Sequence, residues 1–126
     1  EKNNGETLLN LIDKNYVKSA HDVSLGGIIT AISKMCIKGN KGVELKIPKF
    51  LINETEYFFA EDQGRYIIEV SLEDLKNVTK ILDKNSVHYD QIGKIIDKDL
   101  IINQKTKVTI DELKSYNTNW LKNYMV

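Results

Sequence analysis

The order of apolar periodicities constrains the fold of this chain more than any other feature. Segments with apolar residues on one face of a helix alternate with segments in which every second residue is apolar, as in a half-buried strand. We expect helices over 6–15, 26–40, 72–85 and 111–126, and strands over 17–24, 42–48, 65–71, 87–96 and 100–110. The segment 49–59 fits either a short helix or a loop. This order is typical of an α+β fold, a mixed β-sheet with helices packed on one face.

Local signals refine the ends of two expected helices. Ser71 is expected to cap the helix over 72–85, and Asp111 stands in an N-cap setting for the terminal helix. Trp120, Tyr124 and Met125 follow at helical spacing, so we expect them to pack the terminal helix onto the sheet.

The length of 126 residues fits one domain, which we expect to cover residues 1–126. No internal repeat or low-complexity linker divides the chain, and residues 1–5 are expected to be frayed. The sequence begins at Glu1 without an initiator methionine, which suggests a fragment of a longer protein.

Charge and cysteine content exclude several classes of partner. The 18 basic and 18 acidic residues cancel, and no basic stripe with interleaved aromatic residues appears, so nucleic acid is an unfavoured partner. Apolar runs are only a few residues long, so no membrane-spanning segment is expected. The single cysteine, Cys36, cannot form an internal disulfide, and no export leader is present. These features predict a cytoplasmic protein.

The stretch Ala20 to Gly27, "AHDVSLGG", is the first candidate site. A strand that leads through Asp22 and Ser24 to Gly26 and Gly27 at a helix start can form an anion cradle, because exposed N–H groups and the helix dipole favour phosphate or carboxylate. The alternative is structural: Asp22 or Ser24 caps the helix, and the glycines allow close packing. Spacing alone favours the structural alternative.

The stretch "FFAEDQGRY" is the second candidate site, and it contains the only arginine among 18 basic residues. Glu61, Asp62 and Gln63 supply acceptors and an amide for hydroxyl or amide groups, and Arg65 could grip a carboxylate or phosphate. The alternative is a solvated turn in which Arg65 pairs with Glu61 or Asp62. Lysine, which this sequence otherwise prefers, would serve equally well in a surface ion pair. The composition therefore favours an interpretation in which Arg65 binds a ligand.

Other titratable residues carry weaker signals. His21 and His88 are interpreted as structural, since no second metal-binding residue lies near either in the sequence. Glu54 and Glu56 are interpreted as part of a solvated face, and Cys36 has no histidine partner that would make it a nucleophile. We therefore assign no catalytic residue and no metal ligand to this chain.

Both candidate sites match one known family in order and spacing. "AHDVSLGG" resembles that family's "HDVSDGG" turn, "FFAEDQGRYIIEV" resembles its F-[GS]-E-[DS]-Q-[GA]-R-Y segment, and "NWLKNYM" is similar to its "WLPRYM"-like end. On these motifs the chain resembles the C-terminal domain of the phosphoribosylformylglycinamidine synthase (PurL) family, an AIR synthase-related C-terminal domain. Leu25 departs from the pattern, because the family commonly has Asp there, and its loss weakens any metal-binding interpretation of the turn.

The resemblance implies an ATP-dependent ligase of purine biosynthesis. Such enzymes convert formylglycinamide ribonucleotide to the amidine with ATP, Mg²⁺ and ammonia that a glutaminase partner delivers from glutamine. The segment Glu61, Asp62, Gln63 and Arg65 would then face substrate or an auxiliary nucleotide site, with Asp22, Ser24, Gly26 and Gly27 beside it. The catalytic residues and magnesium ligands would lie in other domains of the same chain, so this fragment alone is expected to be inactive and to bind no cofactor tightly.

Two alternatives stay open at this point. The chain could be the equivalent domain of aminoimidazole ribonucleotide synthetase or another superfamily member, in which the same motifs would face a catalytic site. It could also be a stand-alone binding or assembly module that recognises an anionic metabolite through Gly26, Gly27 and Arg65.

Overall fold

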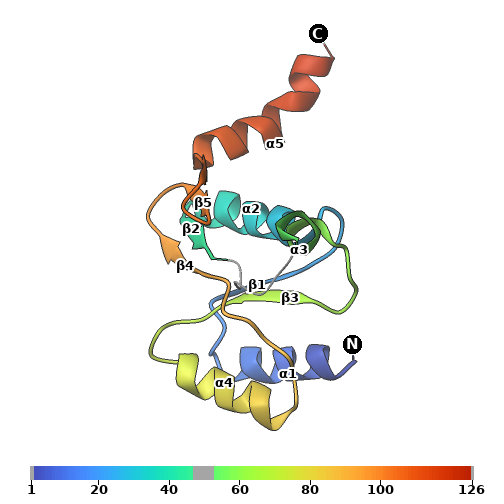
Figure 1. Cartoon of the computed structure of the whole chain (residues 1–126), viewed down its shortest axis with the longest axis vertical. Coiled ribbons are helices and arrows are strands. Elements are labelled where there is room, and N and C mark those ends of the chain that lie inside the picture. The colour runs from blue at the N-terminus through green and yellow to red at the C-terminus, as the bar shows by residue number, and fades with distance from the viewer. Residues whose placement is uncertain (1, 47–52, 126) are drawn as a thin grey trace. The chain divides into compact units, whose positions relative to one another are not determined.

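The computed structural model describes residues 2–46 and 53–125, with the side chain of Trp120 excepted. Helices and strands alternate along it (Figure 1). The helices are α1 (Lys2–Asp13), α2 (Gly27–Gly39), α3 (Glu54–Phe59), α4 (Leu75–Lys84) and α5 (Ile110–Tyr124). The strands are β1 (Ser19–Asp22), β2 (Gly42–Leu45), β3 (Tyr66–Glu69), β4 (Gly93–Ile96), β5 (Leu100–Ile102) and β6 (Thr106–Val108). The α+β fold is therefore confirmed, and the ambiguous segment contains a short helix in its described part.

The chain divides into two compact units. The first comprises residues 1–32 and 55–91, and the second comprises residues 33–54 and 92–126. The predicted strands are correspondingly shared between two sheets rather than joined in one, with β1 and β3 in a two-stranded sheet and β4-β2-β5-β6 in a four-stranded sheet.

In the first unit, β1 and β3 pair antiparallel, with Ser19 opposite Glu69 and Asp22 opposite Tyr66. Helices α1 and α4 lie side by side (Figure 1) and share a core around Leu11, Val78 and Leu82. Leu11 and Val78 are almost fully buried, and each such side chain contributes roughly 1.5–3 kcal/mol through removal from water. This apolar contact between α1 and α4 explains why residues far apart in the sequence form one unit.

Residues 1–5 were expected to be frayed, and residues 2–5 form the start of α1 in the structure. Two asparagine side chains hold this turn in place. Asn3 donates from Nδ2 to the carbonyl of Asn85 at 2.8 Å, and Asn4 donates from Nδ2 to the carbonyl of Gly64 at 3.0 Å. Periodicity could not reveal these contacts because they join residues at least sixty positions apart. Residue 1 lies outside the described residues.

In the second unit, β2 pairs parallel with β5 and antiparallel with β4, while β5 and β6 are antiparallel. The predicted mixed sheet is thus confirmed for these four strands. Leu45 and Leu100 are its most buried side chains. The predicted strand over 100–110 is in fact a hairpin, because Asn103 and Gln104 both adopt positive φ and form a tight turn between β5 and β6.

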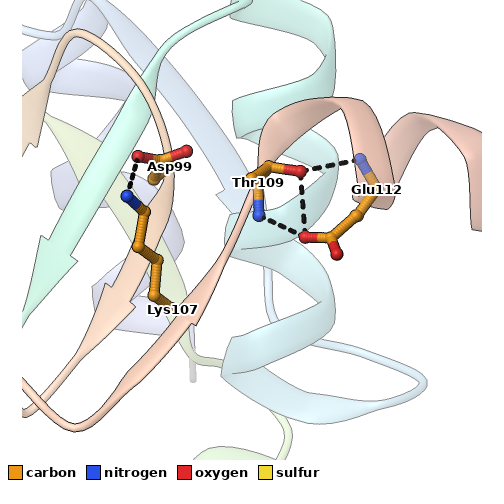
Figure 2. Close-up of polar contacts among 4 residues, drawn as sticks. All are labelled: Asp99, Lys107, Thr109 and Glu112. Atoms are coloured by element: carbon orange, nitrogen blue, oxygen red, sulfur yellow. Dashed lines mark hydrogen bonds and ion pairs between the residues drawn. The ribbon is translucent and has the colours of Figure 1, made fainter.

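The two predicted helix caps have different outcomes. Ser71 makes a capping contact, because its Oγ accepts from the N–H of Asp74 at 3.2 Å, but it precedes a turn and α4 itself begins at Leu75. Thr109, not Asp111, caps α5: its Oγ1 accepts from the N–H of Glu112 at 3.1 Å, and Glu112 Oε2 accepts from the N–H of Thr109 at 2.8 Å (Figure 2). A capping box needs Glu or Gln three residues after the cap, and the residue three positions after Asp111 is Lys114.

The expected packing of the terminal residues onto the sheet is also wrong where it can be described. The side chains of Tyr124 and Met125 are 83% and 76% exposed, and that of Trp120 lies outside the described part. Within residues 2–46 and 53–125, every helix is too short or too polar to cross a membrane.

Candidate functional site

The two sequence motifs meet in the first unit. Strand pairing sets Asp22 opposite Tyr66. The N–H of Val23 donates to the carbonyl of Arg65 at 2.9 Å. The segment that follows β1 and the segment that precedes β3 therefore diverge from the same end of the two-stranded sheet. Between them lies an open cleft of about 380 Å³. It is lined by Asp22, Val23, Ser24, Leu25, Glu61, Gln63, Gly64, Arg65 and Tyr66. Five of the predicted site residues line this cleft, whereas Gly26, Gly27 and Asp62 do not.

A carboxylate of the protein itself occupies part of the predicted anion cradle. The N–H of Gly26 donates to Glu61 Oε1 at 2.7 Å, and the N–H of Gly27 donates to the carbonyl of Ser24 at 3.0 Å. Both N–H groups at the start of α2 therefore have acceptors within the chain. An external anion that approached Gly26 would have to displace Glu61.

The paired glycines also have a packing role. Gly26 and Gly27 have φ values of +85° and +70°, which side-chain-bearing residues rarely adopt. A Cβ on Gly27 would overlap the backbone of Phe58 and Phe59, and one on Gly26 would overlap the side chain of Thr30. These contacts support the structural interpretation of both glycines, because a larger residue at position 27 would not allow α2 to start this close to α3, and one at position 26 would collide with Thr30 of α2.

Arg65 combines a surface ion pair with an aromatic contact. Its Nη1 lies 3.1 Å from Asp62 Oδ2, and its guanidinium carbon lies 5.9 Å from the centre of the Tyr57 ring. The Arg65 side chain is 28% exposed and that of Asp62 is 72% exposed, so solvent screens the pair. The guanidinium also lines the cleft, so it is available to a ligand there.

Tyr57 is a contributor that the sequence did not single out. Burial and the nearby Asp90 raise the pKa of its hydroxyl, while Arg65 partly opposes the shift. Tyr57 therefore stays neutral and serves as the apolar support of Arg65. Its position eight residues before Arg65, within the segment of ambiguous structure, carried no recognisable signal.

The charge of the cleft favours polar neutral groups over a free anion. Among its lining residues, Asp22 and Glu61 are carboxylates and Arg65 is the one basic side chain. Carboxylate oxygens accept hydrogen bonds from hydroxyl and amide groups, and the Gln63 amide both donates and accepts. Arg65 alone offers a charge-assisted contact to an anionic group at this edge.

The remaining titratable residues of the described ranges add no further candidate to the site. In the described ranges no group of three His, Cys, Asp or Glu side chains could hold a metal ion. Burial raises the pKa of the Cys36 thiol to about 11, which disfavours the nucleophilic thiolate. His88 was expected in a strand, but it precedes β4, with a side chain that is 90% exposed and lies 3.4 Å from Asp90. His21 Nδ1 contacts the carbonyl of Asp22 at 2.6 Å and stays a structural candidate.

Curated relatives align with nearly the whole chain. Phosphoribosylformylglycinamidine synthase subunit PurL of Pelagibacter ubique (strain HTCC1062) is 66% identical over 125 residues. The corresponding subunit of Bartonella henselae is 30% identical over 125 residues. Each match covers 99% of this chain, which spans only 17% of the length of either relative.

Solved structures share the fold. The chain matches T. maritima PurL complexed with ATP at a TM-score of 0.76 and 21% identity, over 89% of this chain and 21% of that protein. The T. maritima PurL complexed with FGAR gives the same TM-score and identity, over 20% of its length. The family model for the AIR synthase related protein, C-terminal domain, matches residues 1–103. The chain is therefore a member of the family of AIR synthase related protein C-terminal domains.

Proposed function

We propose that this chain is the C-terminal domain of a phosphoribosylformylglycinamidine synthase subunit of the PurL type. The observation that carries the proposal is the 66% identity to the Pelagibacter ubique subunit, which extends over 125 residues. The cleft between the two motif segments supports it, because several of the residues with which the chain resembles that family line it: Asp22, Ser24, Glu61, Gln63 and Arg65.

The full-length enzyme would convert formylglycinamide ribonucleotide to formylglycinamidine ribonucleotide in purine biosynthesis, in the cytoplasm. ATP would phosphorylate the amide oxygen, and ammonia would then displace phosphate to form the amidine. A glutaminase subunit or domain would supply the ammonia from glutamine. The resemblance places the Mg²⁺ ligands in other domains of the same polypeptide, and we include this placement in the proposal.

The cleft would form one wall of a site that faces a neighbouring domain, and this site would be the auxiliary, non-catalytic one. Glu61 holds the Gly26 N–H through one oxygen, which leaves its other oxygen for a ligand hydroxyl or amide. Gln63 would contribute a second polar contact, and Arg65 would approach an anionic group at the rim. Asp22 and Ser24 would complete this wall. None of these residues would take part in bond making or breaking.

We further propose that residues 1–126 fold as one domain despite their division into two compact units. The chain passes from one unit to the other three times, and the first passage lies within the continuous helix α2. A single calorimetric transition, with equal calorimetric and van't Hoff enthalpies, is the expected result. Two resolved transitions would contradict this proposal.

The catalytic proposal is tested by comparing the 126-residue chain with the full-length protein that contains it. Both are incubated with formylglycinamide ribonucleotide, ATP and ammonium, and amidine formation is measured. We expect turnover by the full-length protein and none by the fragment. An inactive full-length protein, or an active fragment, would contradict the proposal.

A matched control replaces the substrate with formylglycinamidine ribonucleotide and omits ammonium. These conditions report ring closure to the aminoimidazole, which is the activity of the alternative synthetase. ATP-dependent turnover only under these conditions would favour that alternative over the proposed amidine synthesis.

A further inference from the structure

The side chains of helix α5 become exposed after its first turn. Ile110 is buried and Leu113 is half-buried, and Lys114 donates from Nζ to Asn40 Oδ1 at 2.7 Å. From residue 115 to residue 125, every side chain that the structure describes is exposed. Figure 1 shows α5 extending beyond the strands of its unit.

The exposed part of α5 carries an apolar stripe. Tyr116 is 78% exposed, Leu121 is 50% exposed and Tyr124 is 83% exposed. At 3.6 residues per turn these side chains fall on the same side as Leu113, and Trp120 occupies a sequence position between them. Ser115, Asn119 and Lys122 lie on the opposite side, so this part of the helix is amphipathic and its described side chains are exposed.

Such a helix segment is not stable by itself. Isolated helices shorter than about 12–15 residues are marginal in water, and most helical stability in proteins comes from packing of an apolar face. Contiguous exposed aromatic residues are also typical of interaction surfaces, where Tyr contributes strongly to binding. The apolar stripe of α5 therefore requires a covering surface.

Two observations indicate where that surface lies. The family model matches residues 1–103 and stops before α5, whereas the PurL relatives align over 125 residues and thus include it. The sequence of helix α5 thus lies beyond the match to the common domain but within the alignment to the synthase subunits. More than four-fifths of each such relative lies outside the matched region, which provides an extensive surface within the same polypeptide.

We propose that the apolar stripe of α5, formed by Leu113, Tyr116, Leu121 and Tyr124, docks onto another domain of the same full-length polypeptide. The receiving surface is an apolar groove with carbonyl or carboxylate acceptors for the two tyrosine hydroxyls. This proposal rests on the proposed synthase function for the identity of the full-length chain, but its test measures domain contact and not catalysis.

The test is amide hydrogen exchange of residues 115–125, measured in the full-length protein and in the 126-residue chain. Docking is expected to slow exchange in the full-length protein by at least roughly tenfold, because local opening of α5 then requires loss of the contact. Equal exchange rates in the two proteins would overturn the proposal. Enzymatic activity is measured in parallel, so failure of the proposed function is seen separately.

Paired substitutions identify the face that makes the contact. Tyr116→Lys with Tyr124→Lys is expected to return exchange in the full-length protein to the rate of the fragment. The control, Ser115→Lys with Asn119→Lys, adds the same charge to the opposite face and is expected to leave protection unchanged. If the two double substitutions changed the exchange rate equally, the assignment of the contact to the apolar stripe would be overturned.

Other occupants give distinct results. Protection that depends on protein concentration and accompanies dimer formation in light scattering would assign the stripe to a second copy. Protection that appears only when a separate glutaminase subunit is added would assign it to that subunit. Either result overturns docking within one polypeptide.

Discussion

The carboxylate of Glu61 accepts a hydrogen bond of 2.7 Å from the backbone N–H of Gly26, and thereby joins the two motif segments across the cleft. The bond satisfies a donor at the start of α2 with a negative charge, which the helix dipole also favours. The same residue thus supports the turn and offers an acceptor to the cleft.

Substitution of Glu61 by Ala is expected to destabilise the 126-residue chain modestly. Loss of one exposed, charge-assisted hydrogen bond costs about 1 kcal/mol. The change in the free energy of unfolding is measured by urea denaturation. Glu73→Ala, at an exposed carboxylate before α4, is the control and should change stability by less than about 0.5 kcal/mol. Equal losses in the two variants would show that the contact with Gly26 contributes nothing.

Gly27→Ala is expected to be far more damaging than Gly39→Ala. Gly27 has φ of +70°, and an added Cβ would overlap the backbone of Phe58 and Phe59, so a loss of roughly 2–4 kcal/mol is expected. Gly39 lies in α2 with no atom within 4 Å of an added Cβ, and Ala there should raise stability by up to about 1 kcal/mol. Thermal unfolding of both variants checks the contrast. A well-tolerated Gly27→Ala would contradict the close packing of α2 on α3.

Substitution of Arg65 by Lys distinguishes a ligand-binding role of Arg65 from a structural role. Lysine keeps the charge beside Asp62 but loses the planar fork and weakens the contact with Tyr57, so the fragment should lose less than about 1 kcal/mol. In the full-length protein the same change should weaken nucleotide binding at the proposed auxiliary site or weaken domain contacts. A loss above about 2 kcal/mol in urea denaturation of the fragment would instead identify Arg65 as a structural brace.

Thr109→Ala tests the capping box at the start of α5. The Thr109 hydroxyl accepts from the N–H of Glu112, and removal of such a cap costs about 1 kcal/mol. Thr118→Ala is the matched control, because its hydroxyl bonds to Lys114 within the helix and Ala is the better helix former. Far-UV circular dichroism and urea denaturation should show a loss for Thr109→Ala only.

The same cap predicts a pH dependence. Hydrogen bonds from the N–H and then the hydroxyl of Thr109 lower the pKa of Glu112 below its ordinary value of 4.5. Because the folded pKa is lowered, this stabilisation is present above pH 4.5 and is lost as the pH falls through the folded value. Glu112→Gln should show a smaller loss of helicity in that range. An unchanged acid titration of helicity would contradict the role of Glu112.

Cys36 is expected to be unreactive until the chain unfolds. Burial raises its pKa from 9.0 to about 11, so the folded state disfavours the thiolate. The contribution of the neutral thiol to the free energy of unfolding is fully present below pH 9 and declines as the pH rises toward 11. Cys36→Ala should remove this decline. A disulfide reagent should label the native protein slowly at neutral pH and the urea-unfolded protein rapidly. Rapid native labelling would contradict the burial of Cys36.

The sequence by itself determined the kind of structure and the residues of interest. Periodicity predicted α1, α2, α4 and α5 and most strands, because the apolar face of an element is a local property, whereas the segment that contains α3 was left between helix and loop. It failed at the hairpin of β5 and β6, where Asn103 and Gln104 adopt positive φ, and at Ser71, whose turn delays α4. In both places a turn sets the backbone conformation, and the spacing of apolar residues does not indicate such turns.

Only the tertiary structure decided how the candidate residues act together. The pairing of β1 with β3 brings Asp22 next to Tyr66, and it is this register that places Glu61 on the N–H of Gly26. It also decided that Arg65 lies beside Tyr57 as well as Asp62, and that Tyr116 and Tyr124 are exposed. The physical reason is that partners separated by tens of residues are chosen by packing and by satisfaction of backbone donors, neither of which is encoded in local spacing.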